Sequence, residues 1–521
     1  MANNNERQEL HRTIWAIAND LRGSVDGWEF KQYVLGMLFY RYISENITNT
    51  INEDEHEAGN TDFDYAKISD EEAAEIKEDL VNLKGFFIYP SELFQNLKEK
   101  AKTDEDLNVT LKNIFRDIEN SSQGTASEGS FKGLFDDIDV NSNKLGATVA
   151  KRNENLVKLI NGVADMKLGN YQDNTIDAFG DAYEYLMAMY ASNAGKSGGE
   201  YYTPQEVSEL LTRLTIVGKT EVDKVYDPAV GSGSLLLNFA KILGKDNVRQ
   251  GFYGQEINIS TYNLCRINMF LHDIPYDKFD IEHEDTLINP QHLDDGPFEA
   301  IVSNPPYSIK WEGDNNPLLI NDPRFSDAGV LAPKSKADLA FIMHSLSSLS
   351  TNGTAAIVCF PGVMYRGGAE QKIRKYLVSN NFVDCIIQLP ENLFFGTPIA
   401  TCIMVLKKSK TENKTLFIDA SKEFIKVTNN NKLTEDNINK IVETYVEKKD
   451  KIEYFSKLVR NEDIEKENYN LSVSTYVEQE DTREKIDINV LNAEIKEIVL
   501  REASLRNEID KIITEIGVQD E

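Results

Sequence analysis

Short apolar runs recur through the middle of the chain, and stretches with helical spacing of apolar residues separate most of them. Seven of these runs predict β-strands, near 223–227, 250–256, 279–285, 298–304, 354–361, 383–389 and 401–407. Alternation of strands and helices favours a parallel sheet. Only residues 390–400 separate the last two runs, too few for a crossover helix, so the last strand is expected to be antiparallel to its neighbour.

The first 165 residues lack this strand pattern and are predicted to be helical. Apolar residues at helical spacing predict one buried helix face, which we interpret as core packing of a helical domain: Trp28, Phe30, Tyr33, Val34, Met37, Leu38 and Tyr42. Two polar stretches in this region, 49–61 and 119–130, are predicted loops. The region is therefore expected to support the chemistry of the chain without carrying it.

Large aliphatic residues near the C-terminus alternate at spacings of three and four, interrupted only by Glu502: Ile488, Leu491, Ile495, Ile498, Leu505, Ile509, Ile512 and Ile516. This pattern predicts a coiled-coil seam. The helix is expected either to fold back onto its own domain or to pair with helices of a partner. We expect three domains, at 1–165, 166–475 and 476–521, because 521 residues exceed one hydrophobic core.

No targeting or membrane segment is expected, since the N-terminus is polar and no apolar run approaches the ~20 residues that cross a bilayer. A cytoplasmic location is the expectation. The four cysteines are widely separated and are predicted to be buried free thiols: Cys265, Cys359, Cys385 and Cys402. The six histidines have no metal-ligand spacing, so no metal site is predicted.

A glycine-rich turn, Asp227-Pro228-Ala229-Val230-Gly231-Ser232-Gly233-Ser234, follows the first predicted strand and precedes a predicted helix at 235–243. Strand, glycine turn and helix form a nucleotide-binding geometry, although a lone Gly-Ser-Gly also occurs as a purely structural turn. Leu236 occupies the position of the third glycine of the dinucleotide fingerprint, and no Gly-x-x-x-x-Gly-Lys sequence occurs. The turn therefore argues against a dinucleotide or nucleoside triphosphate.

Two carboxylates end the next two predicted strands. Glu256 follows Gly233 by 23 residues and is placed to accept both hydroxyls of a ribose. Asp285 ends the third strand and is placed to accept an adenine amino group. Taken singly, each is better explained as a solvated acid than as a ligand. As successive strand ends after one glycine turn, they predict one adenosine pocket.

The tetrapeptide Asn304-Pro305-Pro306-Tyr307 follows the apolar run Ala300-Ile301-Val302. It is expected in a rigid loop at the carboxyl edge of the sheet, where ligands bind in open α/β folds. Two prolines fix φ and remove two donors, so the loop presents mainly carbonyl oxygens. An Asn amide oxygen, a Pro carbonyl and an aromatic ring suit a planar ligand with an NH₂ group. Asn-Pro-Pro is also compatible with an ordinary turn, but the glycine turn upstream favours a binding site.

These segments resemble known motifs. The segments 227–234, 285–287 and 304–307, with Glu256, are similar to the motifs of amino-methylating DNA methyltransferases. Further segments resemble the modification subunits of Type I restriction–modification systems: 17–23, 199–205, 333–338, 361–368 and 389–394. The resemblance covers nearly the whole chain. It implies a seven-stranded Rossmann-like methyltransferase sheet with an antiparallel last strand, preceded by an α-helical N-terminal domain and followed by a coiled-coil-like helix.

The resemblance implies transfer of a methyl group from S-adenosylmethionine to N6 of adenine in duplex DNA, with the target base flipped into the pocket. The implied catalytic residues are Asn304, Pro305, Pro306 and Tyr307. The cofactor-binding residues are expected in two groups: Asp227, Gly231, Ser232, Gly233, Ser234, Glu256 and Asp285, and, by the resemblance at the methionine end, Glu200, Tyr201, Tyr202, Thr203, Pro204 and Gln205. Methylation at C5 of cytosine needs a nucleophilic cysteine, usually after proline, and no Pro-Cys occurs.

Two other functions are compatible with the chemistry. Enzymes that methylate glutamine side chains of release factors also use Asn-Pro-Pro-Tyr, but they are much shorter and lack the helical front and the coiled tail. A catalytically silent scaffold would keep the fold for assembly alone, and the intact Asn304, Tyr307 and Glu256 argue against it.

The net charge of −30, from 56 Lys and Arg against 86 Asp and Glu, has the wrong sign for a chain that binds DNA by itself. No target-recognition domain is evident. The resemblance implies a specificity subunit that reads the DNA sequence and binds the C-terminal helix, a restriction subunit in the full complex, and two modification subunits for each specificity subunit.

Overall fold

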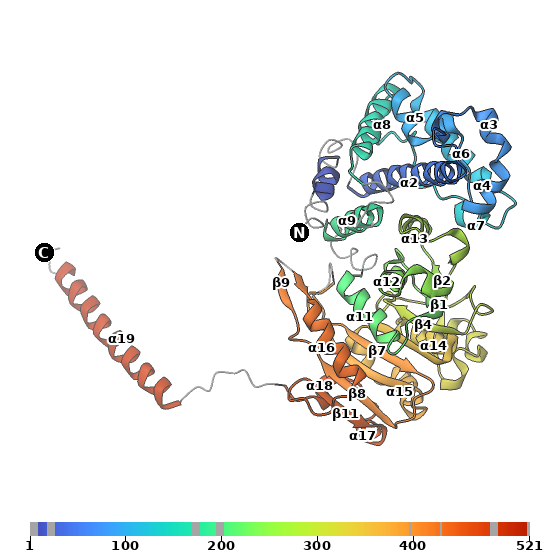
Figure 1. Ribbon diagram of the computed structural model, residues 1–521. Helices are drawn as coiled ribbons and strands as arrows, with labels where there is room; N and C mark the ends of the chain where they lie inside the picture. Colours follow the sequence, from blue (N-terminus) through green and yellow to red (C-terminus); the bar gives the residue numbers. More distant parts are fainter. Residues whose placement is uncertain are drawn as a thin grey trace. The chain divides into compact units, whose positions relative to one another are not determined.

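The computed structural model describes residues 9–17, 27–168, 178–193, 203–394, 398–427, 430–479 and 488–517. It forms two compact units, Met1–Val477 and Glu478–Glu521. The first unit holds a helical region and a large mixed sheet (Figure 1). The second holds one long helix.

The helical region is organised around α2 (Gly27–Glu57), which contacts α5, α8 and α9. Its other helices are α3 (Asp70–Glu75), α4 (Lys77–Lys84), α5 (Phe94–Lys100), α6 (Leu107–Ser121), α7 (Glu128–Phe131), α8 (Val149–Ala164) and α9 (Ala178–Asn193). Of the predicted apolar face, Tyr33, Val34, Met37, Leu38 and Tyr42 are buried. The loop predicted at 49–61 was wrong over residues 49–57, which continue α2 into solvent with a polar surface.

The sheet has nine strands in the order β11-β8-β6-β7-β5-β4-β1-β2-β3. Their bounds are β1 (Val222–Asp227), β2 (Val248–Glu256), β3 (Phe279–His283), β4 (Phe298–Ser303), β5 (Leu349–Cys359), β6 (Val383–Gln388), β7 (Cys402–Lys407), β8 (Lys414–Asp419) and β11 (Ser456–Arg460). β7 is antiparallel to both β5 and β6, as the short 390–400 connection predicted. β9 (Ile425–Val427) and β10 (Asn430–Lys432) form a separate two-stranded sheet.

Alternate residues along each strand point to opposite faces of the large sheet. Helices cover both faces. Val225 and Val302 pack in one core with α11 (Gln205–Thr215), α12 (Ser234–Leu243), α13 (Ile259–Leu271), α16 (Glu435–Val446) and the helical region. Tyr226 and Ile301 pack in the other core with α14 (Asp338–Ser348), α15 (Ala369–Ser379), α17 (Asn461–Lys466) and α18 (Val473–Tyr476). β1 pairs in parallel with β2 and with β4, and β2 pairs in parallel with β3, so the carboxyl ends of these four strands meet at one edge.

Seven strands lie where the apolar runs predicted them; β8 and β11 of the large sheet were missed, as were β9 and β10. β8 carries a short apolar run, Leu416-Phe417-Ile418, that belongs to the sheet because β8 pairs parallel with β6. β11 is an edge strand, antiparallel to β8, and its exposed Lys457 and Arg460 give it no apolar alternation. These two strands extend the sheet beyond the predicted last strand.

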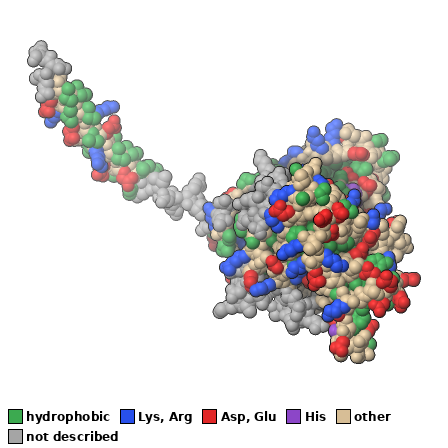
Figure 2. Space-filling model, turned by 90° about the horizontal axis from the view of Figure 1, so that it is seen from above, with side chains coloured by type: hydrophobic (Ala, Val, Ile, Leu, Met, Phe, Trp, Pro, Cys, Tyr) green, Lys and Arg blue, Asp and Glu red, His purple; other side chains and the backbone are tan. Residues whose placement is uncertain are grey.

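Helix α19 (Ile488–Gly517) forms the second unit, and all of its residues are exposed. The predicted C-terminal helix is therefore confirmed, and its eight seam residues are all exposed. Four more large apolar residues are exposed on it, Val490, Val499, Leu500 and Ile513. Figure 2 shows apolar side chains along the helix.

The four cysteines are free and buried, as predicted. Among the described residues, no helix is long and apolar enough to cross a bilayer.

Candidate active site

The turn that follows β4 holds Asn304 and Tyr307 in direct contact. The Tyr307 hydroxyl donates a hydrogen bond of 2.6 Å to Oδ1 of Asn304, and Nδ2 of Asn304 donates one of 3.1 Å to Oγ1 of Thr203. Burial raises the pKa of the Tyr307 hydroxyl, so it remains a neutral donor. The two partners fix the orientation of the amide. Because an amide oxygen has two lone pairs, Oδ1 can accept one more hydrogen bond.

Gly231 and Gly233 give the turn after β1 its shape, with φ values of 56° and 82°. A Cβ at Gly233 would lie 2.9 Å from Sγ of Cys265 and 3.0 Å from Cε of Met269, so α13 packs against this glycine. Nδ2 of Asn268 donates to the Ser232 carbonyl at 2.7 Å and holds the turn from the same helix. At Gly231 a Cβ would meet nothing within 4 Å. Helix α13 therefore packs closely against the turn at Gly233, whereas the space beside Gly231 is open.

Glu256 joins the end of β2 to the glycine turn. Its Oε2 accepts a hydrogen bond from the Gly231 amide at 3.1 Å, and its Oε1 accepts one from the Asn258 amide at 2.9 Å. Burial raises the pKa of Glu256, and these two amide bonds partly offset that rise. A carboxylate accepts about four hydrogen bonds, so two sites remain for a ligand.

We expect Glu256→Ala to weaken binding of S-adenosylmethionine by about 10- to 100-fold, since each charge-assisted hydrogen bond contributes roughly 1.5–3 kcal/mol. Calorimetric titration measures the change. Glu221→Ala is the control, because Glu221 is exposed and precedes the amino end of β1, away from the glycine turn. An unchanged dissociation constant in the Glu256 variant would remove Glu256 from the site.

Asp227 is fully buried at the end of β1. Its Oδ1 accepts a hydrogen bond from the Ala229 amide at 3.0 Å, and its Oδ2 has no hydrogen-bond partner among the described residues. Burial raises the pKa of Asp227 to about 7, and interactions with the Ala229 amide and the Ser303 side chain partly offset that rise. A ligand donor that reaches Oδ2 would therefore share it with the neighbouring Ser303 side chain.

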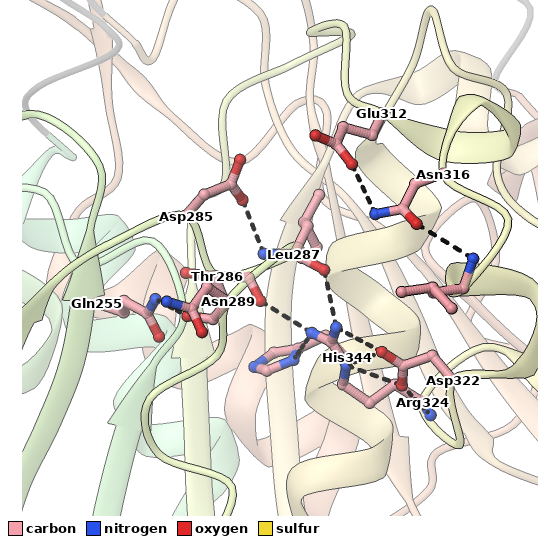
Figure 3. Close-up of polar contacts among 11 residues, drawn as sticks. Gln255, Asp285, Thr286, Leu287, Asn289, Glu312, Asn316, Asp322, Arg324 and His344 are labelled. Atoms are coloured by element: carbon pink, nitrogen blue, oxygen red, sulfur yellow. Dashed lines mark hydrogen bonds and ion pairs between the residues drawn. The ribbon is translucent and has the colours of Figure 1, made fainter.

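Asp285 lies in a loop whose main chain is fixed by hydrogen bonds of buried side chains. Its Oδ1 accepts a hydrogen bond from the Leu287 amide at 2.9 Å, and Oγ1 of Thr286 donates to the Pro228 carbonyl at 2.6 Å. Arg324 donates from Nη1 to the Thr286 carbonyl and from Nη2 to the Leu287 carbonyl, both at 2.8 Å (Figure 3). Arg324 thus fixes the main chain directly after Asp285.

Arg324 is itself held by two groups. Its Nη2 lies 2.7 Å from Oδ2 of Asp322, and its Nη1 lies 3.1 Å from Nδ1 of His344. Arginine only donates, so Nδ1 of His344 must be the acceptor. Nε2 of His344 then carries the proton and donates to the Tyr226 hydroxyl oxygen, 2.9 Å away. Burial and Arg324 lower the pKa of His344 to about 3, consistent with this neutral form.

We expect Arg324→Lys to weaken S-adenosylmethionine binding roughly tenfold while leaving the rate at saturating cofactor unchanged. Lysine keeps the charge but lacks the planar fork of donors with which arginine reaches both carbonyls and Asp322. The loss of one charged hydrogen bond costs at least ~1.5 kcal/mol. Cofactor KM and kcat are the measurements. Arg213→Lys, which changes an arginine bonded to Asn439, is the control. A drop in kcat with unchanged KM would contradict this role.

The 199–205 segment is described only from Thr203 onward, so Glu200, Tyr201 and Tyr202 lie outside the described residues. Thr203 meets the catalytic turn, as given above. Pro204 precedes α11 as its N-cap residue. Nε2 of Gln205 donates to Glu184 at 2.6 Å, and its Oε1 accepts from Asn238 at 3.3 Å. Gln205 therefore joins α9 to α12.

The Ser232 and Ser234 hydroxyls lie 3.1 Å apart in the glycine turn. One further group of possible metal ligands, Asp280, His292 and Asp295, lies in the described part of the chain. Nδ1 of His292 is 2.9 Å from Asp295 and its Nε2 is 3.0 Å from the Gly254 carbonyl. Hydrogen bonding accounts for this arrangement.

Two family models match the chain: one described as N-6 DNA Methylase over residues 174–485, and one described as HsdM N-terminal domain over residues 10–163. The chain is 50% identical to the MpnII methylase subunit of a Type I restriction enzyme from Mycoplasma pneumoniae, over 98% of this chain and 97% of that protein.

Solved structures give the same picture. A type I restriction-modification methyltransferase subunit from Streptococcus thermophilus superposes with a TM-score of 0.80 and 37% identity, over 91% of this chain and all of that chain. A chain from a structure of type I restriction-modification complex assembly superposes with a TM-score of 0.65 over 99% of each chain, and at 18% identity it supports the fold alone.

Proposed function

The chain belongs to the family of Type I restriction enzyme methylase subunits with an N-6 DNA methylase domain, and on that premise we propose that its turn at Asn304 transfers a methyl group from S-adenosylmethionine to N6 of adenine in duplex DNA. The observation that carries this proposal is the Asn304 amide. It stands at the carboxyl edge of β4, oriented by Tyr307 and Thr203, with acceptor capacity left on Oδ1.

The residues at this edge of the sheet offer hydrogen-bonding groups that suit the cofactor. Glu256 would hold the ribose hydroxyls, Asp285 the adenine amino group, and Oδ2 of Asp227 would accept from a further donor on the cofactor. Gly231 leaves open space where a side chain would otherwise stand. When bound, S-adenosylmethionine supplies a methyl group already activated by its sulfonium, so no protein nucleophile is required.

The catalytic turn acts by position and dipole. Oδ1 of Asn304 and the Pro305 carbonyl accept the two N6 hydrogens, which directs the nitrogen lone pair away from the ring and favours tetrahedral geometry. The Tyr307 ring would stack on the flipped base, while its hydroxyl holds the Asn304 amide. Pro306 keeps the turn rigid.

We propose that α19 binds a specificity subunit, which reads the DNA, and that two copies of this chain join one such subunit together with a restriction subunit. Large apolar residues of α19 lie on the seam and also outside it. Those outside the seam are Val490, Val499, Leu500 and Ile513. A two-stranded coiled coil needs only the seam. The wider apolar surface suits contact with more than one helix. Because the proposed substrate is DNA, we also propose that the protein is cytoplasmic.

Titration of the purified full-length chain with S-adenosylmethionine tests the cofactor assignment. Saturable binding at one site per chain supports an enzyme. Absence of binding, with the chain folded, would favour a catalytically silent scaffold.

A further inference from the structure

Two segments with family resemblance, 333–338 and 361–368, pack around the exit of the catalytic turn. The first pairs with the residues directly after Tyr307. The Ser308 amide donates to both carboxylate oxygens of Asp338 at 3.1 Å, and the Ala337 amide donates to the Ile309 carbonyl at 3.0 Å. The two segments are thus joined immediately beside the proposed base pocket.

This pairing continues through Trp311. Its amide donates to the Lys334 carbonyl at 3.0 Å, and its indole Nε1 donates to the Pro333 carbonyl at 3.1 Å. The Lys336 amide donates to the same Pro333 carbonyl at 2.8 Å, which closes a β-turn with Lys334 and Ser335 at its corner. The corner is exposed. The fold therefore displays Lys334 and Lys336 on a turn fastened to residues 309–311, beside Lys310.

The second segment supplies an arginine on the same side. The Arg366 guanidinium lies 5.0 Å from the centre of the Phe360 ring, and that ring lies 6.5 Å from the Tyr307 ring. Arg366 and Lys336 both act on Asp338, lowering a pKa that burial raises. Glu370 lies 3.6 Å from Arg366 and is its one carboxylate within ion-pair distance among the described residues.

We name Lys310, Lys334, Lys336 and Arg366 the cationic rim. None of its three lysines forms an ion pair among the described residues, although Lys336 acts electrostatically on Asp338 and Glu370. Because ion pairs do not hold these ammonium groups, they can bind an anionic ligand beside the catalytic turn.

We propose that the cationic rim binds the DNA phosphates on either side of the flipped adenine. This inference rests on the proposed function, since a base stacked on Tyr307 brings its own backbone to the edge of the turn. Lysine is a flexible point charge and suits phosphates of any sequence, as a subunit that does not read sequence requires. The rim would thus supply phosphate contacts in a chain whose net charge is −30.

Salt dependence of DNA binding tests the rim. The full-length chain is assembled with its specificity subunit, and the affinity for a duplex carrying the target site is measured between about 50 and 200 mM salt. Each phosphate contact contributes a slope of about −0.9 in log K against log salt. We expect Lys334→Ala with Lys336→Ala to reduce the slope by about 1.8, and Lys334→Arg with Lys336→Arg to restore it.

The control is Lys414→Ala with Lys457→Ala, which removes the same charge from strands β8 and β11 at the far end of the sheet. An unchanged slope in the rim alanine pair would overturn the proposal, as would an equal loss in the control or a loss that the arginine pair does not restore. The last result would assign the segment to packing or to an acidic segment of the partner. S-adenosylmethionine affinity of the same variants stays at the wild-type value, so a failure of the cofactor pocket is recognised separately.

Discussion

Replacing Asn304 with alanine is expected to lower the methylation rate by on the order of 100-fold or more, while S-adenosylmethionine affinity stays nearly intact. The amide oxygen acts on the amino group of the base, and its dipole matters most as the nitrogen changes geometry. The other contacts of Asn304, to Tyr307 and Thr203, orient that oxygen. Single-turnover methylation by the assembled complex and calorimetry with the cofactor measure the two quantities.

Asn380→Ala is the matched control, because Asn380 is an exposed amide at the end of α15 that bonds only to the Tyr376 carbonyl of its own helix. Its rate should equal the wild-type rate. Near-normal turnover in the Asn304 variant would rule out a catalytic role for Asn304, whatever the affinity of the variant for the cofactor.

Changing Ile495 and Ile509 together to aspartate is expected to abolish site-specific methylation without affecting cofactor binding. Both residues are exposed on α19 at seam positions. In an assembled interface they would become buried, unpaired carboxylates, which cost several kcal/mol. Size-exclusion chromatography of the chain with its specificity subunit measures assembly. A chain ending before Ile488 should behave in the same way.

Asn507→Asp with Thr514→Asp adds the same charge on the face of α19 opposite the seam, at positions that do not adjoin Leu500. This control should assemble normally. Normal assembly of the isoleucine variant, or of the shortened chain, would show that the specificity subunit binds elsewhere.

The residues that the sequence located are those that end strands. Asp227, Glu256 and Asn304 each follow a short apolar run, and parallel strands place such residues on one edge. Periodicity identified seven strands and the antiparallel β7. It did not identify β11, because this edge strand carries charged, exposed residues at Lys457 and Arg460 and shows no apolar alternation.

Contacts between segments that lie far apart in the chain could not be predicted from the sequence. Thr203 lies 101 positions from Asn304, and its hydroxyl orients the amide only because α11 brings it to the end of β4. Arg324 lies 38 positions from Thr286, in a loop without regular spacing, and nothing local marks it as the support of Asp285. The Pro333 to Asp338 motif was visible in the sequence, but its pairing with 308–311 was not.

Mapping the transferred methyl group tests the central claim most directly. The chain, assembled with its specificity subunit, is incubated with labelled S-adenosylmethionine and genomic duplex DNA, and the modified bases are identified and located. The account predicts label in N6-methyladenine at one defined sequence, and none with the chain alone. Label in cytosine or in a protein glutamine, or site-specific methylation by the chain without a partner, would contradict it.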